Sequence, residues 1–114
     1  MLTLFSQETI DNIMALYVDG LKTELGDNLK AVVLYGSCAR GDHEIGSDID
    51  VFVLVNNNDN DVIETIRRIA SRLNWDYDTV MSNTICSAYK YNRFYYETLF
   101  QNIRQEGKAY YGAV

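Results

Sequence analysis

The chain has 114 residues, 47% of them hydrophobic and 23% charged, with a formal net charge of −6 at pH 7. This length and composition suit one globular domain with a single core, so we expect residues 1–114 to form one domain. The acidic balance argues against a long nucleic-acid ligand, and no signal-peptide pattern or stretch of transmembrane length is visible, which predicts a cytoplasmic protein without a membrane partner.

The first half of the chain predicts a helix followed by two buried strands. Apolar residues recur at helical spacing over residues 6–25, with Ser6 suited to the N-cap and Gly26 to the C-terminal stop. Short apolar runs at 31–35 and 49–55 predict two strands.

The second half predicts a further helix, a strand and a mostly helical end. Residues 59–73 place their apolar side chains on one helical face. Residues 74–81 alternate as in a strand, and residues 84–107 are mostly helical, with a break near Tyr91 and Asn92. The order α-β-β-α-β-α predicts an α/β (α+β) fold in which a mixed sheet of three or more strands packs against helices.

The pattern that points to chemistry joins a Gly-Ser turn to two nearby carboxylates. Gly36 and Ser37 follow the first strand, and after ten intervening residues Asp48 and Asp50 begin the second. On a strand, i and i+2 side chains share a face. Two such charges about 7 Å apart repel by roughly 2 kcal/mol at an effective dielectric constant of about 20. A hard divalent cation with a phosphate behind it would offset that repulsion.

Two polar residues of this segment allow alternative roles. Ser47 could donate a hydrogen bond to Asp48 or shape the turn before the strand. Arg40 could bind a phosphate or pair with a neighbouring carboxylate such as Asp42 or Glu44.

A third carboxylate could come from the strand predicted at 74–81. Asp76 and Asp78 both lie there and would point to the same face, so alternation does not choose between them. The alternative is an exposed polar strand face.

Other reactive residue types are better explained by packing or solvation. His43, the single histidine, lies in a polar loop and is expected to be solvated rather than catalytic. Cys38 and Cys86 lack metal-ligand spacing and are expected to be free thiols that pack. The tyrosines near the C-terminus are mostly expected to pack, with one or two left for a partner surface. These are Tyr89, Tyr91, Tyr95, Tyr96, Tyr110 and Tyr111.

The chain resembles the minimal nucleotidyltransferases of the DNA polymerase beta superfamily, in which a GSxARG segment leads to SDID. Here Gly36 to Gly41 and Ser47 to Asp50 reproduce that pattern. The element order fits as well, and so does the ending from Ile103 to Lys108 followed by two tyrosines. The resemblance therefore implies a small nucleotidyltransferase fold and Mg²⁺-dependent transfer of a nucleoside monophosphate with release of pyrophosphate.

The same resemblance implies roles for individual residues. Gly36 and Ser37, with Arg40 and Ser47 of the motif, would bind ATP as the nucleotide donor. Asp48 and Asp50 would hold two Mg²⁺ ions. Asp78 is preferred to Asp76 as the third carboxylate, a metal ligand and a base for the acceptor hydroxyl, because the Thr-Val that follows it fits the family strand.

The resemblance also suggests an acceptor. The small members of the family often resemble MntA-type antitoxins of HEPN–MNT toxin–antitoxin pairs, which implies transfer of AMP to a tyrosine of a HEPN toxin. Because no substrate domain is visible in 114 residues, the acceptor site is expected on a partner or on a second copy in a homo-oligomer. The alternatives are a non-catalytic antitoxin that acts by contact and a small-molecule, antibiotic-type nucleotidyltransferase.

Overall fold

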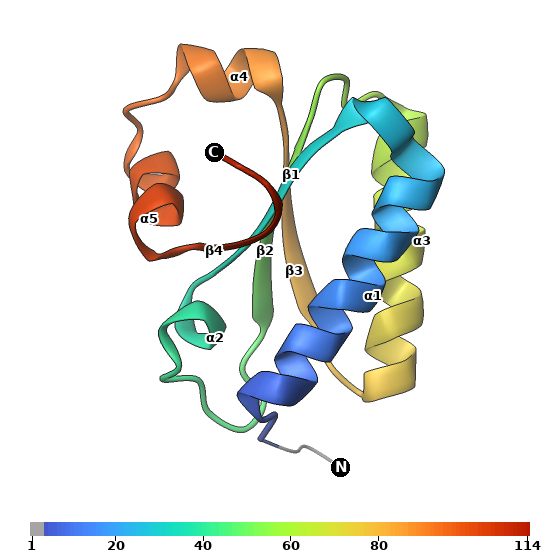
Figure 1. Cartoon of the computed structure of the whole chain (residues 1–114), viewed down its shortest axis with the longest axis vertical. Coiled ribbons are helices and arrows are strands. Elements are labelled where there is room, and N and C mark those ends of the chain that lie inside the picture. The colour runs from blue at the N-terminus through green and yellow to red at the C-terminus, as the bar shows by residue number, and fades with distance from the viewer. Residues whose placement is uncertain (1–3) are drawn as a thin grey trace.

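The computed structural model describes residues 4–114, which form a four-stranded sheet with helices on both faces (Figure 1). The strand order is β3–β2–β1–β4. β1 pairs antiparallel with β2 and β4, whereas β2 and β3 are parallel. The strands are β1 (Leu29–Tyr35), β2 (Ile49–Val55), β3 (Met81–Ser87) and β4 (Lys108–Gly112). A mixed sheet packed against helices confirms the predicted fold class.

Within residues 4–114 no helix is both long and apolar enough to span a membrane. The sequence-based expectation that a signal peptide is missing depends partly on residues 1–3, which lie outside the described residues.

Helix α1 (Gln7–Leu25) begins and ends where the sequence predicts. The Ser6 side chain accepts a hydrogen bond from the Thr9 backbone N–H at 3.1 Å. At the other end Gly26 has φ 52°, a backbone conformation that favours glycine. A single 3₁₀ turn, η1 (Gly26–Asn28), then leads into β1.

Two hydrophobic cores lie on opposite faces of the sheet. Helices α1 and α3 (Asn60–Tyr77) cover one face, and α4 (Ala88–Arg93) and α5 (Thr98–Glu106) cover the other (Figure 1). Alternate β2 residues enter the two cores, as a strand with two covered faces requires. Ile49, Val51 and Val53 pack towards α1 and α3, whereas Phe52 and Leu54 pack towards α4 and α5.

The prediction of a strand at residues 74–81 is wrong. Helix α3 continues to Tyr77, four residues beyond its predicted end, and β3 begins only at Met81. Tyr77 lies four positions after Leu73 and packs against the same core, so the apolar helical face continues through this segment. The alternation of Asp76 and Asp78 with apolar residues was misleading there.

The C-terminal part differs from the prediction in three places. Residues 84–87 belong to β3 rather than to a helix, and the helical region breaks at 94–97, not at Tyr91 and Asn92. β4 pairs with β1 at the sheet edge, although its residues carry no continuous apolar pattern.

The C-terminal tyrosines divide between packing and exposure, and three rings rather than the expected one or two are exposed, namely Tyr89, Tyr95 and Tyr96. Tyr91 is buried against Phe52 and Phe100, with ring centroids 5.8 Å and 5.1 Å away. Tyr89 and Tyr96 are 74% and 81% exposed. A partner for these exposed rings stays a prediction.

Candidate functional site

The two motif carboxylates lie at the start of β2, on the sheet face that α4 and α5 cover further along. Asp50 and Phe52 share this face by strand alternation, and Phe52 belongs to the α4–α5 core. Asp48 directly precedes the strand and is exposed, whereas Asp50 is half-buried. The Asp48 side chain accepts a hydrogen bond from Ser82 of β3, the residue that pairs with Asp50 in the parallel register. The two carboxylates therefore face the same open end of the sheet.

Gly36 closes tightly over Asp50. Its φ is 73°, and a Cβ at this position would lie 2.3 Å from Asp50 Oδ2. Tyr35, the preceding residue, pairs with Asp50 across the β1–β2 ladder, which sets this approach. Only glycine satisfies both the backbone conformation and the spacing. The structure thus brings the Gly-Ser turn and the carboxylates together, as the sequence predicted.

The electrostatics at Asp50 favour its neutral form. Burial raises its pKa, the Asp48 charge raises it further, and the Arg40 charge partly opposes both. The folded protein is less stable when the Asp50 carboxyl is ionised, and a bound cation would offset that loss of stability. The local charge balance therefore suits a cation.

Ser37 begins a four-residue helix, α2 (Ser37–Arg40), that joins the two strands through a loop. Cys38 of this helix is buried, and its thiol donates to the Asp48 backbone carbonyl at 3.6 Å. Burial is the main cause that raises the Cys38 pKa. The thiol is therefore a packing group that anchors the backbone of Asp48, as predicted, rather than a nucleophile.

Arg40 forms ion pairs within the protein. Its guanidinium contacts Asp42 at 3.3 Å and Glu106 of α5 at 3.0 Å. The alternative of a carboxylate pair is confirmed with Asp42, although Glu106 rather than Glu44 is the second partner. Both contacts are well exposed, so they can exchange for a phosphate at little energetic cost.

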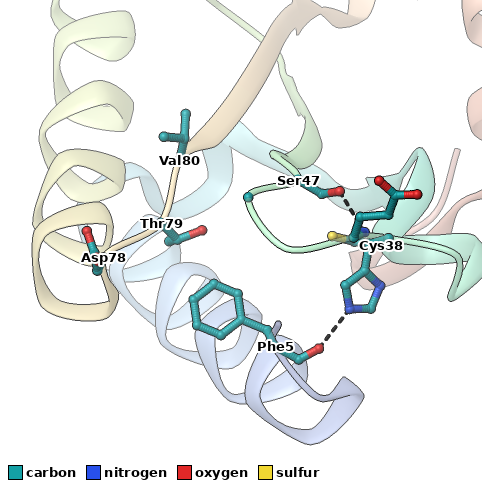
Figure 2. A pocket seen from close by; sticks show the side chains of 9 residues that line it. Phe5, Cys38, Ser47, Asp78, Thr79 and Val80 are labelled. Carbon is teal, nitrogen blue, oxygen red and sulfur yellow. Dashed lines mark hydrogen bonds between the residues drawn. The ribbon is translucent and has the colours of Figure 1, made fainter. Parts of the chain in front are cut away.

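Ser47 shapes the loop before β2. Its hydroxyl accepts a hydrogen bond from the Glu44 backbone N–H at 2.8 Å, and its own N–H donates to the Glu44 carbonyl at 3.0 Å. This favours the turn-forming role over a bond to Asp48. Figure 2 shows Ser47 at the rim of a pocket of about 110 Å³.

This pocket lies beside the carboxylates and does not include them. Phe5 lies on one side, and Asp78, Thr79 and Val80 lie on another (Figure 2). His43, expected to be solvated, is instead partly buried, and its Nε2 is 2.7 Å from the Phe5 carbonyl oxygen. The histidine therefore ties the loop to the segment before α1.

The third carboxylate is placed differently from the prediction. Asp76 is in α3, and Asp78 is the C-cap residue of that helix with φ 51°, so neither lies on a strand beside β2. Within residues 4–114 no three His, Cys, Asp or Glu side chains are grouped closely enough to hold a metal ion. The structure brings Asp48 and Asp50 together without Asp78.

Sequence reasoning missed Ser82, which occupies the strand position beside the two carboxylates. Its hydroxyl donates to Asp48 Oδ2 at 3.0 Å. The sequence carried no local signal for it, because the position of Ser82 beside Asp50 follows from the pairing of β3 with β2.

Mg²⁺ in nucleotide sites is usually held by one or two carboxylates, substrate phosphates and water. Asp48 and Asp50 supply two carboxylates, and Ser37, which follows Gly36, supplies a hydroxyl that can donate to a phosphate. The residues present therefore fit a magnesium–nucleotide complex without a third carboxylate.

Comparison with known proteins gives a consistent family assignment. Residues 17–102 match the family model described as "Nucleotidyltransferase domain". A protein of Methanocaldococcus jannaschii named "Putative protein adenylyltransferase MJ0604" is 27% identical over 95 residues, which cover 83% of this chain and 91% of the relative.

Solved structures share the fold. A chain of a toxin–antitoxin structure with AMP-PNP superposes with a TM-score of 0.62 at 23% identity, covering 90% of this chain and 73% of that one. A complex of a tri-AMPylated Shewanella oneidensis HEPN toxin with its MNT antitoxin gives 0.58 at 20% identity, with 95% and 74% covered. At these identities the likeness shows the fold alone.

Proposed function

Because this chain belongs to the nucleotidyltransferase domain family, we propose that it transfers AMP from ATP to a tyrosine hydroxyl of a HEPN-type toxin and releases pyrophosphate. The observation that carries the proposal is the close approach of Gly36 to Asp50, the second of the two motif carboxylates, which places the Gly-Ser turn directly against the start of β2. The toxin–antitoxin structures with this fold support the choice of partner, and the adenylyltransferase relative supports the choice of AMP.

Each residue of the site has a proposed task. The backbone at Gly36 and the Ser37 hydroxyl hold the phosphates of ATP, because glycine allows close approach and serine can donate. Arg40 adds positive charge beside Asp50 and can turn to a phosphate by leaving its exposed carboxylate partners. Asp48 and Asp50 hold the Mg²⁺ ions and so fix the triphosphate relative to the sheet.

The proposed reaction is an in-line displacement at the α-phosphorus. The tyrosine hydroxyl loses its proton to water, its oxygen forms a bond to that phosphorus, the bond from phosphorus to the oxygen that bridges to the β-phosphate breaks, and pyrophosphate leaves. Bound Mg²⁺ would supply charge neutralisation for the phosphates and lower the pKa of the acceptor hydroxyl. The contribution of this chain is positioning and a fixed electrostatic field.

The proposal is tested with α-labelled ATP, Mg²⁺ and the product of the adjacent gene. Wild-type protein is expected to label the partner, and the Asp48→Asn/Asp50→Asn variant is expected to leave it unlabelled. Asp19→Asn is the matched control, because it removes an exposed carboxylate on α1, far along the chain from the site, and should label normally.

Other outcomes would identify the alternatives. Label on an aminoglycoside rather than on protein would indicate a small-molecule nucleotidyltransferase. Equal neutralisation of the partner by wild type and the double variant, without label, would indicate an antitoxin that acts by contact.

A further inference from the structure

The two carboxylates of the site are held in different ways. Asp50 is half-buried, and its carboxylate occupies the space that a side chain at position 36 would fill. Asp48 is exposed and precedes the strand, so packing does not restrict its side chain in the same way. An exposed carboxylate that must bind a cation needs another constraint on its rotamer.

Strand β3 supplies that constraint. The parallel register pairs Asp50 with Ser82, and alternation turns Ser82 and Cys86 to the same face, where Cys86 joins the core that contains Phe52. The Ser82 hydroxyl donates to Asp48 Oδ2 at 3.0 Å. A hydrogen bond to one carboxylate oxygen leaves the lone pairs of the other oxygen for a cation.

The backbone of Asp48 is anchored separately. The buried Cys38 thiol donates to its carbonyl oxygen, and the next residue, Ile49, donates its N–H to the Val80 carbonyl at 2.8 Å. Both hydrogen bonds hold the peptide group that joins Asp48 to Ile49. These contacts do not restrict rotation about the Asp48 side-chain bonds, and the Ser82 hydrogen bond is the contact that does.

From these contacts we infer that Ser82 is a positioning residue, which holds the Asp48 carboxylate in the orientation that binds the magnesium–nucleotide complex. The inference rests on the proposed function for its consequence in catalysis, but the orientation itself is a property of the metal-free protein. Partners that orient metal-binding side chains typically contribute 10- to 100-fold to metal affinity or activity. Because this site is exposed, we expect about tenfold.

The chain offers a matched control on the same strand. Thr84 lies two residues after Ser82, on the same face, and its hydroxyl bonds to Tyr35 at 3.0 Å rather than to a carboxylate. Thr84→Val removes that hydroxyl with little change in shape. Ser82→Ala removes the proposed donor, Ser82→Thr keeps it, and Ser82→Cys keeps the side-chain size with a weaker donor if the alanine variant does not fold.

The first readout uses no ligand. Three-bond couplings that report the χ1 rotamer of Asp48 are measured by NMR on labelled protein in a metal chelator. Wild type, Ser82→Thr and Thr84→Val should show one dominant rotamer, and Ser82→Ala should show averaged couplings. Averaged couplings in wild type, or unchanged couplings in Ser82→Ala, would overturn the inference.

The second readout is binding of a non-hydrolysable ATP analogue by calorimetry at increasing Mg²⁺. Ser82→Ala should need about tenfold more Mg²⁺ for half-maximal binding, and Ser82→Thr should restore the wild-type value. An equal loss in Thr84→Val would contradict a specific role of Ser82. If wild type binds no nucleotide but Asp48 is ordered and Ser82→Ala frees it, the proposed function fails while the positioning role stands.

Discussion

Two glycines near the site allow backbone strain to be separated from contact with Asp50. Gly36 and Gly41 have φ of 73° and 80°, but a Cβ on Gly41 would meet nothing within 4 Å. Gly36→Ala and Gly41→Ala should therefore each cost about 1 kcal/mol of unfolding free energy. Only Gly36→Ala displaces the Asp50 carboxyl, so it should lower AMP transfer by about 100-fold or more.

Urea unfolding and the labelled-ATP assay measure these two effects on the same preparations. Equal activity of the two alanine variants would show that the close approach of Gly36 to Asp50 has no role in transfer.

Asp50 predicts a specific pH dependence of stability. Burial and the Asp48 charge raise its folded-state pKa, so between the unfolded and folded pKa values the native protein binds more protons than the unfolded chain. The contribution of this group to stability therefore falls as pH rises through that interval. In metal-free protein, Asp50→Asn should increase the unfolding free energy at pH 7 while abolishing transfer.

The check is urea unfolding in a chelator from about pH 3 to about pH 7, with Asp19→Asn as the control. The stabilisation by Asp50→Asn should vanish at the acid end, where the wild-type carboxyl is protonated. A variant that is less stable than wild type at pH 7 would contradict the electrostatic account of the site.

At the scale of elements, a buried hydroxyl holds α1 against the edge strand that carries Ser82. Tyr17 is fully buried, and its hydroxyl donates to Asn83 Oδ1 at 2.6 Å. Burial raises the pKa of Tyr17, which keeps this donor protonated. Tyr17→Phe should cost about 1–2 kcal/mol of unfolding free energy, because the Asn83 carbonyl loses its partner.

Tyr35→Phe is the comparison for this change, because the Tyr35 hydroxyl bonds Thr84 of the same strand from the opposite, half-buried side. Its cost in urea unfolding should be smaller. Faster amide exchange along β3 is expected for Tyr17→Phe. An equal or greater loss with Tyr35→Phe would show that the buried contact does not dominate.

Most elements could be predicted from the sequence where local pattern and packing agree. Ser6 and Gly26 mark the ends of α1 because capping depends on residue type at one position. The prediction for residues 74–81 failed because the polar end of a helix and a half-exposed strand can show the same alternation of polar and apolar residues. Only the contact of Tyr77 with the core distinguishes the helix from the strand. β4 depends on pairing with β1, which no local signal carries.

At the scale of the whole molecule, the two faces of the sheet carry the hydrophobic cores, and the candidate site lies at the start of β2. Helices α1 and α3 pack on one face and α4 and α5 on the other (Figure 1), and at the start of β2 Asp48 is exposed and Asp50 is half-buried. The motif spacing predicted this meeting of Gly36 with the carboxylates. The register of β3 with β2 decides that Ser82, rather than Asp78, stands beside them. That register depends on tertiary pairing, so the sequence alone could not assign it.

The most direct test of the account is the intact mass of the HEPN partner after co-expression with this chain. Partner produced with wild type should carry one or more adenylyl groups, and partner produced with Asp48→Asn/Asp50→Asn should carry none. An unmodified partner that both proteins bind and neutralise equally would contradict the account, because the two carboxylates would then have no part in the function.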